Sequence, residues 1–265
     1  MGRMTALLTL ACLATLAQTP EGATPQTSVP GTDRTVYRDR AFGFEIEVPD
    51  GWRLLLDDTL EQQFAGVVEE GAAPPGFRAG LQPAAHGAVL RPPYALVQTV
   101  PYTQMGLDGV PEPAAMQDVL RGISGAELVE RSTTMLTPEA RERLAHVDMD
   151  TATFDPESFR FRYAIEVDRG ADRLRGEAAG LFGRYAFMQV LVYGEPENWA
   201  ATAAVRSQLT RSFTALPDAR LPENYGQPSP VLRFVVMVVG GAVAGALGLW
   251  FGVQLRRRAQ RRPAR

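Results

Sequence analysis

An uncharged apolar stretch near the C-terminus limits the possible folds of this chain more than any other segment. Residues 234–255 read FVVMVVGGAVAGALGLWFGVQL. As a helix this stretch would extend about 33 Å, which matches the hydrocarbon core of a bilayer. Six arginines lie in the ten residues that follow, and the positive-inside rule places them in the cytoplasm. The pattern predicts a transmembrane helix over 231–255 and a cytoplasmic arginine-rich tail over 256–265. A buried core helix is the alternative, but nothing follows the stretch for it to pack within.

Two pairs of glycines in the predicted span are each spaced four residues apart, Gly241 with Gly245 and Gly248 with Gly252. Such residues form a flat strip along which two helices can approach closely. The strip favours a homo- or hetero-oligomer formed through the membrane helix, with a protein partner that the sequence does not identify. The alternative is that glycine is simply common in transmembrane helices. The tail arginines are expected to contact anionic membrane lipid, at about 1 kcal/mol each.

The N-terminal residues 1–17 have the pattern of a signal peptide. Arg3 precedes an apolar stretch from Thr5 to Leu16, which is too short to cross a bilayer comfortably, and Thr15-Leu16-Ala17 suits cleavage. A buried N-terminal helix and a lipoprotein signal around Cys12 are the alternatives. Together with the C-terminal span, the pattern predicts a single-pass protein of the cell membrane. Its N-terminal domain would be extracytoplasmic, either periplasmic or on the cell surface.

A processed C-terminus is a second interpretation of the same end of the chain. An arginine cluster after an apolar span also ends bacterial sorting signals, and Leu221-Pro222-Glu223-Asn224 is similar to the sortase motif LPxTG. Asn224 stands where the motif has threonine, and Tyr225 intervenes before Gly226. In this alternative the chain is an envelope or surface protein whose span is removed.

Charge and cysteine content exclude several classes of function. All 30 acidic residues lie between Glu21 and Glu223, and the 19 arginines of that segment leave it a net charge of −11. Such a body is a poor partner for nucleic acid. The chain has no lysine, which excludes a P-loop or Schiff-base lysine. Cys12 is the only cysteine and lies in the predicted signal peptide, so the mature chain would have no disulfide and no thiol nucleophile.

The rest of the sequence predicts one α+β domain over residues 35–216. Residues 18–34 are typical of a disordered lead-in, and residues 217–230 of a proline-rich stalk. Period-two alternation indicates strands, and the short helices are expected to cover a mostly antiparallel sheet. The predicted strands are 42–48, 52–56, 94–100, 158–167, 174–181 and 185–193, the predicted helices are 112–121, 137–145 and about 16 residues from Glu195, and 71–93 is predicted to be a loop.

The segment YRDRAFGFEIEVPDGW, residues 37–52, combines a strand with a turn. Alternating apolar residues from Phe42 to Val48 suit a half-buried strand, and Pro49-Asp50-Gly51 is turn chemistry. Trp52 is expected to anchor the core. A Trp52 exposed in a pocket would instead indicate a binding site.

Three segments carry a resemblance to a known family. Residues 37–52 resemble the opening pattern Y-x-D-x-x-x-G-F-x-I-x-x-P-x-G-W of the PsbP-like and DcrB-like families. Residues 185–193 are similar to their late central strand, and residues 207–216 to their closing helix. The resemblance covers about residues 35–216. It implies an α/β/α sandwich and an extracytoplasmic role in assembly or binding, usually without catalysis, and it carries over no binding residue.

Candidate catalytic and metal-binding patterns are few. His146, Asp148 and Asp150 form H-x-D-x-D, which in an extended strand would project from one face as metal ligands do. A solvated polar edge is the competing interpretation. His86 lies in a Gly/Ala-rich segment and is expected to be exposed and inert. Ser124 lacks the G-x-S-x-G context of a nucleophile, and the paired carboxylates 57–58 and 69–70 lie in polar surroundings.

These observations predict a membrane-anchored extracytoplasmic module for binding or assembly, with no catalytic residue, no cofactor and no metal. A metal-assisted hydrolase that uses His146, Asp148 and Asp150 is the alternative of a different class.

Overall fold

The computed structural model describes residues 34–64, 76–123, 137–138, 146–169, 172–222 and 225–226. The chain divides into two compact units, 1–223 and 224–265, and the description that follows concerns the first. The predicted signal peptide 1–17, the span 231–255 with Gly241, Gly245, Gly248 and Gly252, and the tail 256–265 lie outside the described residues. Within the part of the chain that is described, no helix is long and apolar enough to cross a membrane.

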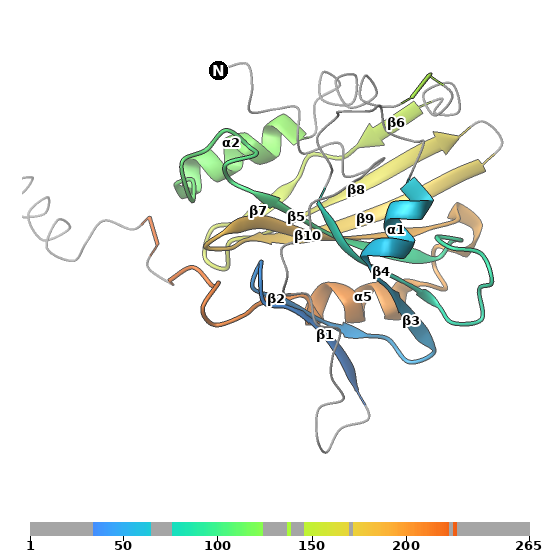
Figure 1. Cartoon of the computed structure of the whole chain (residues 1–265). Coiled ribbons are helices and arrows are strands. Elements are labelled where there is room, and N and C mark those ends of the chain that lie inside the picture. The colour runs from blue at the N-terminus through green and yellow to red at the C-terminus, as the bar shows by residue number, and fades with distance from the viewer. Residues whose placement is uncertain are drawn as a thin grey trace, which may run out of the picture. The chain divides into compact units, whose positions relative to one another are not determined.

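A large antiparallel sheet forms the centre of this unit (Figure 1). Its strand order is β3-β4-β5-β10-β9-β8-β6, and β7 pairs with β8 outside this path. All pairings found among the described strands are antiparallel. The strands are β3 (Trp52–Leu55), β4 (Phe77–Pro83), β5 (Tyr94–Pro101), β6 (His146–Met149), β7 (Thr153–Asp155), β8 (Arg160–Arg169), β9 (Asp172–Phe182) and β10 (Ala186–Gly194).

The alternation of β8 explains its place near one edge of the sheet. Phe161, Tyr163, Ile165 and Val167 are buried, whereas Arg162 and Glu166, which alternate with them, are exposed. This is the alternation that the sequence predicts for a half-buried strand. Every residue of β10 is buried, which confirms the strand predicted over 185–193 and shows that it is covered on both faces.

Helices cover both faces of the large sheet, but they share one face with a second sheet. Figure 1 shows α1 (Asp57–Phe64) and α2 (Pro113–Ile123) on one side of the sheet, and α5 (Ala203–Ser212) on the other side with β1 (Thr35–Asp39) and β2 (Phe44–Val48). The small sheet has the order β1-β2-β11, with β11 at Thr214–Ala215. The expected α/β/α sandwich is therefore corrected to a more sheet-rich α+β arrangement.

The main core lies between the large sheet and the layer of α5 and the small sheet. Phe44 and Ile46 of β2 pack with Leu209 of α5, Phe213, and the even-numbered residues of β10. The rings of Phe44 and Phe213 lie 5.5 Å apart in a tilted arrangement. The predicted strand around Phe44 is confirmed, and Trp52 N–H donates to Pro49 O at 3.0 Å, which closes the predicted turn.

Two predicted boundaries differ from the structure. The predicted loop 71–93 contains β4, an inner strand whose alternation is concealed because glycine and polar residues stand among its buried positions. Gly80 lets α1 approach this strand, since an added Cβ would lie 3.1 Å from the Leu60 side chain. The long helix expected from Glu195 is divided into a short 3-10 helix, η2 (Pro196–Asn198), and α5.

The segment after β11 packs onto the domain, although residues 217–230 were predicted to form a stalk. Ala219 is fully buried and Leu221 nearly so. Ala219 lies against Gly43, whose φ of +77° and lack of a side chain make room for it. Arg184 N–H also donates to Ala219 O at 2.7 Å. A stalk can therefore begin only after about residue 222.

Candidate functional site

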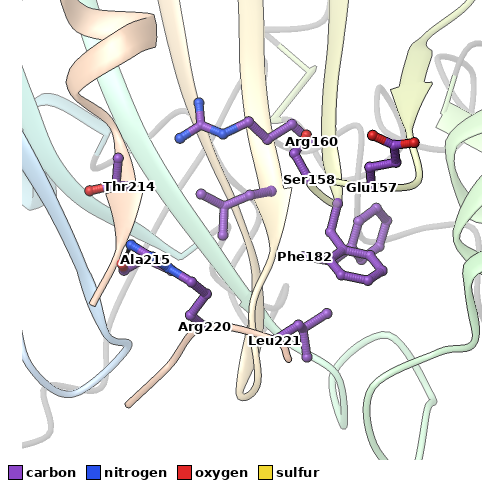
Figure 2. A pocket seen from close by; sticks show the side chains of 10 residues that line it. Glu157, Ser158, Arg160, Phe182, Thr214, Ala215, Arg220 and Leu221 are labelled. Atoms are coloured by element: carbon purple, nitrogen blue, oxygen red, sulfur yellow. Dashed lines mark hydrogen bonds between the residues drawn. The ribbon is translucent and has the colours of Figure 1, made fainter. Parts of the chain in front are cut away.

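A pocket of about 280 Å³ lies where β8 and β9 meet β11 and the segment that follows it (Figure 2). This volume is slightly below the range of about 300–1,000 Å³ that is usual for small-molecule sites. Its apolar wall includes Leu181, Phe182 and Leu221. Its polar groups include Ser158, Thr214 and the side chains of two arginines, Arg160 and Arg220.

Arg160 enters the pocket from the first position of β8. It belongs to the polar face of that strand and pairs in register with Leu181 of β9. Its Nη2 donates to Phe213 O at 2.8 Å, and its Nη1 donates to Thr210 O at 3.4 Å. Both acceptors lie at the C-terminal end of α5, where backbone carbonyls lack helical partners. Arg160 therefore caps a helix and lines the pocket at the same time.

Arg220 approaches the same side of the pocket from the segment after β11. Its Nη2 donates to Ala215 O at 3.4 Å, a long bond, and the residue is exposed. Figure 2 shows the guanidinium groups of Arg160 and Arg220 on one side of the pocket, with Thr214 beside them and Glu157 on the opposite side. Among the described residues, no carboxylate forms an ion pair with either arginine.

No ion pair found among the described residues neutralises the positive charge of the two pocket arginines. Burial lowers the pKa of the Arg160 guanidinium below its ordinary value, and the charges of Arg162 and Arg220 lower it further. A guanidinium nevertheless stays protonated at neutral pH. Burial and the neighbouring charges both disfavour the charged form of Arg160. An anion beside Arg160 would favour the charged form and so offset these effects.

The opposite wall is built by a tight turn between β7 and β8. Asp155 accepts hydrogen bonds from Ser158 Oγ and, at 3.0 Å, from the Glu157 amide. These bonds lower the pKa of the Asp155 carboxyl, and the bond from Ser158 contributes most. Phe159 then has a φ of +56°, in the left-handed region. Both oxygens of the Asp155 carboxylate therefore accept hydrogen bonds from within this turn.

The H-x-D-x-D residues lie elsewhere, on the outer strand β6. His146 and Asp148 are exposed on one face of this strand, opposite Asp168 and Glu166 of β8. Those two acids pair with Arg173 and Arg175 of β9, at 2.9 and 3.9 Å. Asp150 lies just beyond β6, and its amide donates to Ala164 O. Among the described residues, no three or more His, Cys, Asp or Glu side chains form a group suited to a metal ion.

Trp52 is half-buried and lines a second pocket, of about 440 Å³, at the other end of β10. It packs against the core cluster, as expected of a core anchor, but it is only partly buried. His86 lines the same pocket and is half-buried instead of exposed; its carbonyl accepts from Arg53 Nη2 at 2.8 Å. The residues that line this pocket include one arginine, Arg91, and one acid, Glu195, so their charges are equal and opposite. We therefore take the pocket with two arginines as the candidate site.

Sequence reasoning did not identify this site. Arg160 falls within the predicted strand 158–167, and Arg220 within the predicted stalk 217–230. No local pattern connects them, because one arginine begins β8 and the other follows β11. The one available signal was the alternation of β8, which places Arg160 on the face opposite Phe161.

Comparisons with known proteins add a fold-level resemblance. No family model and no curated protein matches the chain. The model is similar to the solution structure of cyanobacterial PsbP (CyanoP) from Synechocystis sp. PCC 6803, with 13% identity, a TM-score of 0.40, and coverage of 72% of this chain and 99% of that one. It is also similar to the crystal structure of LpqN of Mycobacterium tuberculosis, involved in cell envelope biogenesis, with 15% identity, a TM-score of 0.38, and coverage of 71% and 88%. CyanoP bears the name of the family that the sequence motifs resemble. TM-scores below 0.5 do not establish a common fold, and the family relation stays a resemblance.

Proposed function

We propose that residues 35–222 form a non-catalytic binding domain for an anionic group, carried on the extracytoplasmic side of the membrane by the predicted span 231–255. The observation that supports this function is the pocket in which Arg160 and Arg220 face a shared space without an acidic partner among the described residues.

The hydrogen-bonding capacity of the two arginines supports an anion as the ligand. A guanidinium has five N–H donors, and the bonds found use two nitrogens of Arg160 and one of Arg220. A phosphate or carboxylate could accept from the donors that remain. Hydrogen bonds to a charged group contribute about 1.5–3 kcal/mol each, and arginine provides the planar geometry that such groups need.

The size and walls of the pocket favour a small anionic group. Its 280 Å³ equals the volume of roughly nine water molecules in the liquid, at about 30 Å³ each. This is enough for a phosphate with a short attached chain. Phe182 and Leu181 provide apolar surface for that chain.

A binding role without catalysis agrees with the residues that line the pocket. None of the ten lining residues is a histidine, cysteine, lysine or aspartate. Glu157 is exposed and lies across the pocket from the arginines (Figure 2). General acid–base catalysis needs a group whose pKa lies near the working pH.

The alternative of a metal site at His146, Asp148 and Asp150 is not supported by any observation on the described residues.

The membrane topology in this proposal comes from the sequence. The uncharged stretch 234–255 and the arginine tail support an anchored, single-pass protein. The glycine pairs at Gly241, Gly245, Gly248 and Gly252 support association of the anchor with a second helix.

Anion binding is tested with the full chain in a neutral detergent. Thermal unfolding is followed with inorganic phosphate, and with chloride at matched ionic strength. Phosphate is expected to raise the midpoint for the wild type, because a ligand of the native state stabilises it. Arg220→Gln should lose most of this shift because it removes one of the two cationic groups of the pocket. The fold should tolerate the change, since one long bond is found for Arg220 among the described residues.

Arg173→Gln serves as the matched control, because Arg173 is an exposed strand arginine that pairs with Asp168 away from the pocket. This variant should keep the full phosphate shift. Arg160→Gln is less informative by itself, since it also removes the cap of α5. A wild type without a phosphate shift, or an Arg220→Gln variant with an unchanged one, would contradict the proposal.

A further inference from the structure

We infer that the anionic group taken by this pocket is the phosphate of a membrane lipid headgroup. This inference rests on the proposed function and adds to it a partner. Three observations carry it: the chain leaves the domain at the pocket, an exposed tyrosine and arginine lie at the same end, and the pocket is cationic.

The first observation is where the chain leaves the domain. Leu221 lines the pocket and is nearly buried. Twelve residues, 222–233, separate it from Phe234, the first residue of the uncharged stretch. The pocket therefore lies at the point where the chain leaves the described domain toward the predicted span.

The second observation is the tip of the β9–β10 hairpin. Tyr185 is 50% exposed and is the one large hydrophobic side chain found exposed among the described residues. Arg184 beside it is also exposed, and its amide bonds to Ala219 in the segment that leads to Arg220. The hairpin tip and the pocket thus belong to the same end of the domain. Tyrosine is enriched at the membrane–water interface, where its ring lies at headgroup level.

The third observation is the charge within the pocket. Arg160 and Arg220 lie on one side of it, and Arg184 lies at the nearby hairpin tip. Glu157 and Asp218 are exposed close by, so the attraction to lipid comes from the pocket and not from the net charge of the whole end. Near an anionic membrane, each arginine is drawn to lipid phosphates, and this attraction weakens with salt.

The opposite end of the sheet differs in its exposed acids. The nine residues of β10 separate the two ends by about 30 Å. Beyond β10 the chain continues into exposed Glu195 and Glu197, whose charges an anionic membrane repels. This end therefore provides a control site in the same molecule.

The test uses the full-length chain with Cys12→Ser, reconstituted in lipid nanodiscs. An environment-sensitive fluorophore is attached at Asp218→Cys on the pocket end, or at Glu197→Cys on the opposite end. Both positions are exposed acids outside the strands of the large sheet, Asp218 in a turn and Glu197 in the short η2, so the two labels form a matched pair. Discs of neutral phosphatidylcholine are compared with discs that also contain anionic phosphatidylglycerol.

We expect the emission of the Asp218→Cys label to shift to the blue in anionic discs, and the Glu197→Cys label to stay unchanged. Arg220→Gln and Tyr185→Ser, each added to the Asp218→Cys chain, should reduce the shift at least twofold. High salt should reduce it as well. Equal emission of the two labels in both lipids, or a shift that neither variant changes, would overturn the inference.

Free phosphate separates the two possible sources of the anion. If the pocket holds a lipid headgroup, millimolar inorganic phosphate should compete and reverse part of the shift. If inorganic phosphate raises the unfolding midpoint in detergent but anionic lipid leaves the Asp218→Cys label unchanged, the lipid inference fails and the proposed anion site stands. If phosphate has no effect in detergent, the proposed function itself fails.

Discussion

Asp39 Oδ2 accepts a hydrogen bond from Arg78 Nε at 3.0 Å, in an ion pair whose side chains are 0% and 8% exposed. Asp39 Oδ1 also accepts from the Phe42 amide, and Tyr37 Oη donates to Arg78 O. The family-like pattern Y-x-D thus marks two side chains that join the β1–β2 hairpin to β4. Arg78 lies in the segment that was predicted to be a loop.

Breaking this buried pair should destabilise the domain strongly. Asp39→Asn leaves the Arg78 guanidinium buried without its counter-charge, which costs about 3–5 kcal/mol. The matched control is Glu45→Gln, because Glu45 pairs with Arg38 in an exposed bridge of 2.8 Å on the same hairpin, worth less than about 1 kcal/mol. Denaturant unfolding of the full chain in detergent measures both changes. Similar losses for the two variants would show that burial does not set the strength of the Asp39–Arg78 pair.

A methyl group at Gly43 should loosen the segment that lines the pocket. The added Cβ would lie only 2.1 Å from Ala219 Cβ, on a residue with φ +77°. Gly51→Ala is the control, since Gly51 has φ +73° and nothing lies within 4 Å of the added Cβ. Both variants carry the backbone strain, and Gly43→Ala should cost about 1–3 kcal/mol more from overpacking. Hydrogen exchange at the Arg184 amide, which bonds to Ala219 O, should rise for Gly43→Ala alone.

The turn that forms one wall of the pocket should open in acid. Hydrogen bonds, first from Ser158, lower the pKa of Asp155 below its ordinary value of 3.8. A carboxyl with a lowered native pKa contributes stability that is complete above the unfolded value and is lost as the pH falls through the native value. The Ser158 amide signal in NMR of the full chain should therefore titrate with a pKa below 3.8. In Asp155→Asn this titration should disappear, and a transition above 3.8 would contradict the assignment.

Core truncations should differ according to burial and not to side-chain size. Phe213 is 1% exposed and packs against Phe44, so Phe213→Ala should cost about 3–5 kcal/mol. Trp52 is larger but only half-buried, beside the second pocket. Trp52→Ala should therefore cost less than Phe213→Ala in denaturant unfolding of the same full chain. The reverse order would place Trp52 in the core that the sequence predicted for it.

Local patterns anticipated many of the elements, and long-range contacts explain where they failed. The strand at Phe44, the alternation of β8 and the buried β10 were predicted because the period of their side chains is local. β4 was missed because it is buried on both faces and carries Arg78, Gly80 and Gln82 within it. Arg78 is buried against Asp39 of β1, a partner distant in the sequence, which a local pattern cannot show.

The sequence by itself determined the periodic strands, the turn before Trp52 and the expectation of a C-terminal membrane anchor. Each of these depends on neighbouring residues, through side-chain period or a continuous run of apolar residues. Only the tertiary structure decided that Arg160 and Arg220 share a pocket, that Asp39 pairs with Arg78, and that Ala219 packs against Gly43. These contacts join segments far apart in the chain, and their energy comes from burial and charge that exist only once the sheet has formed.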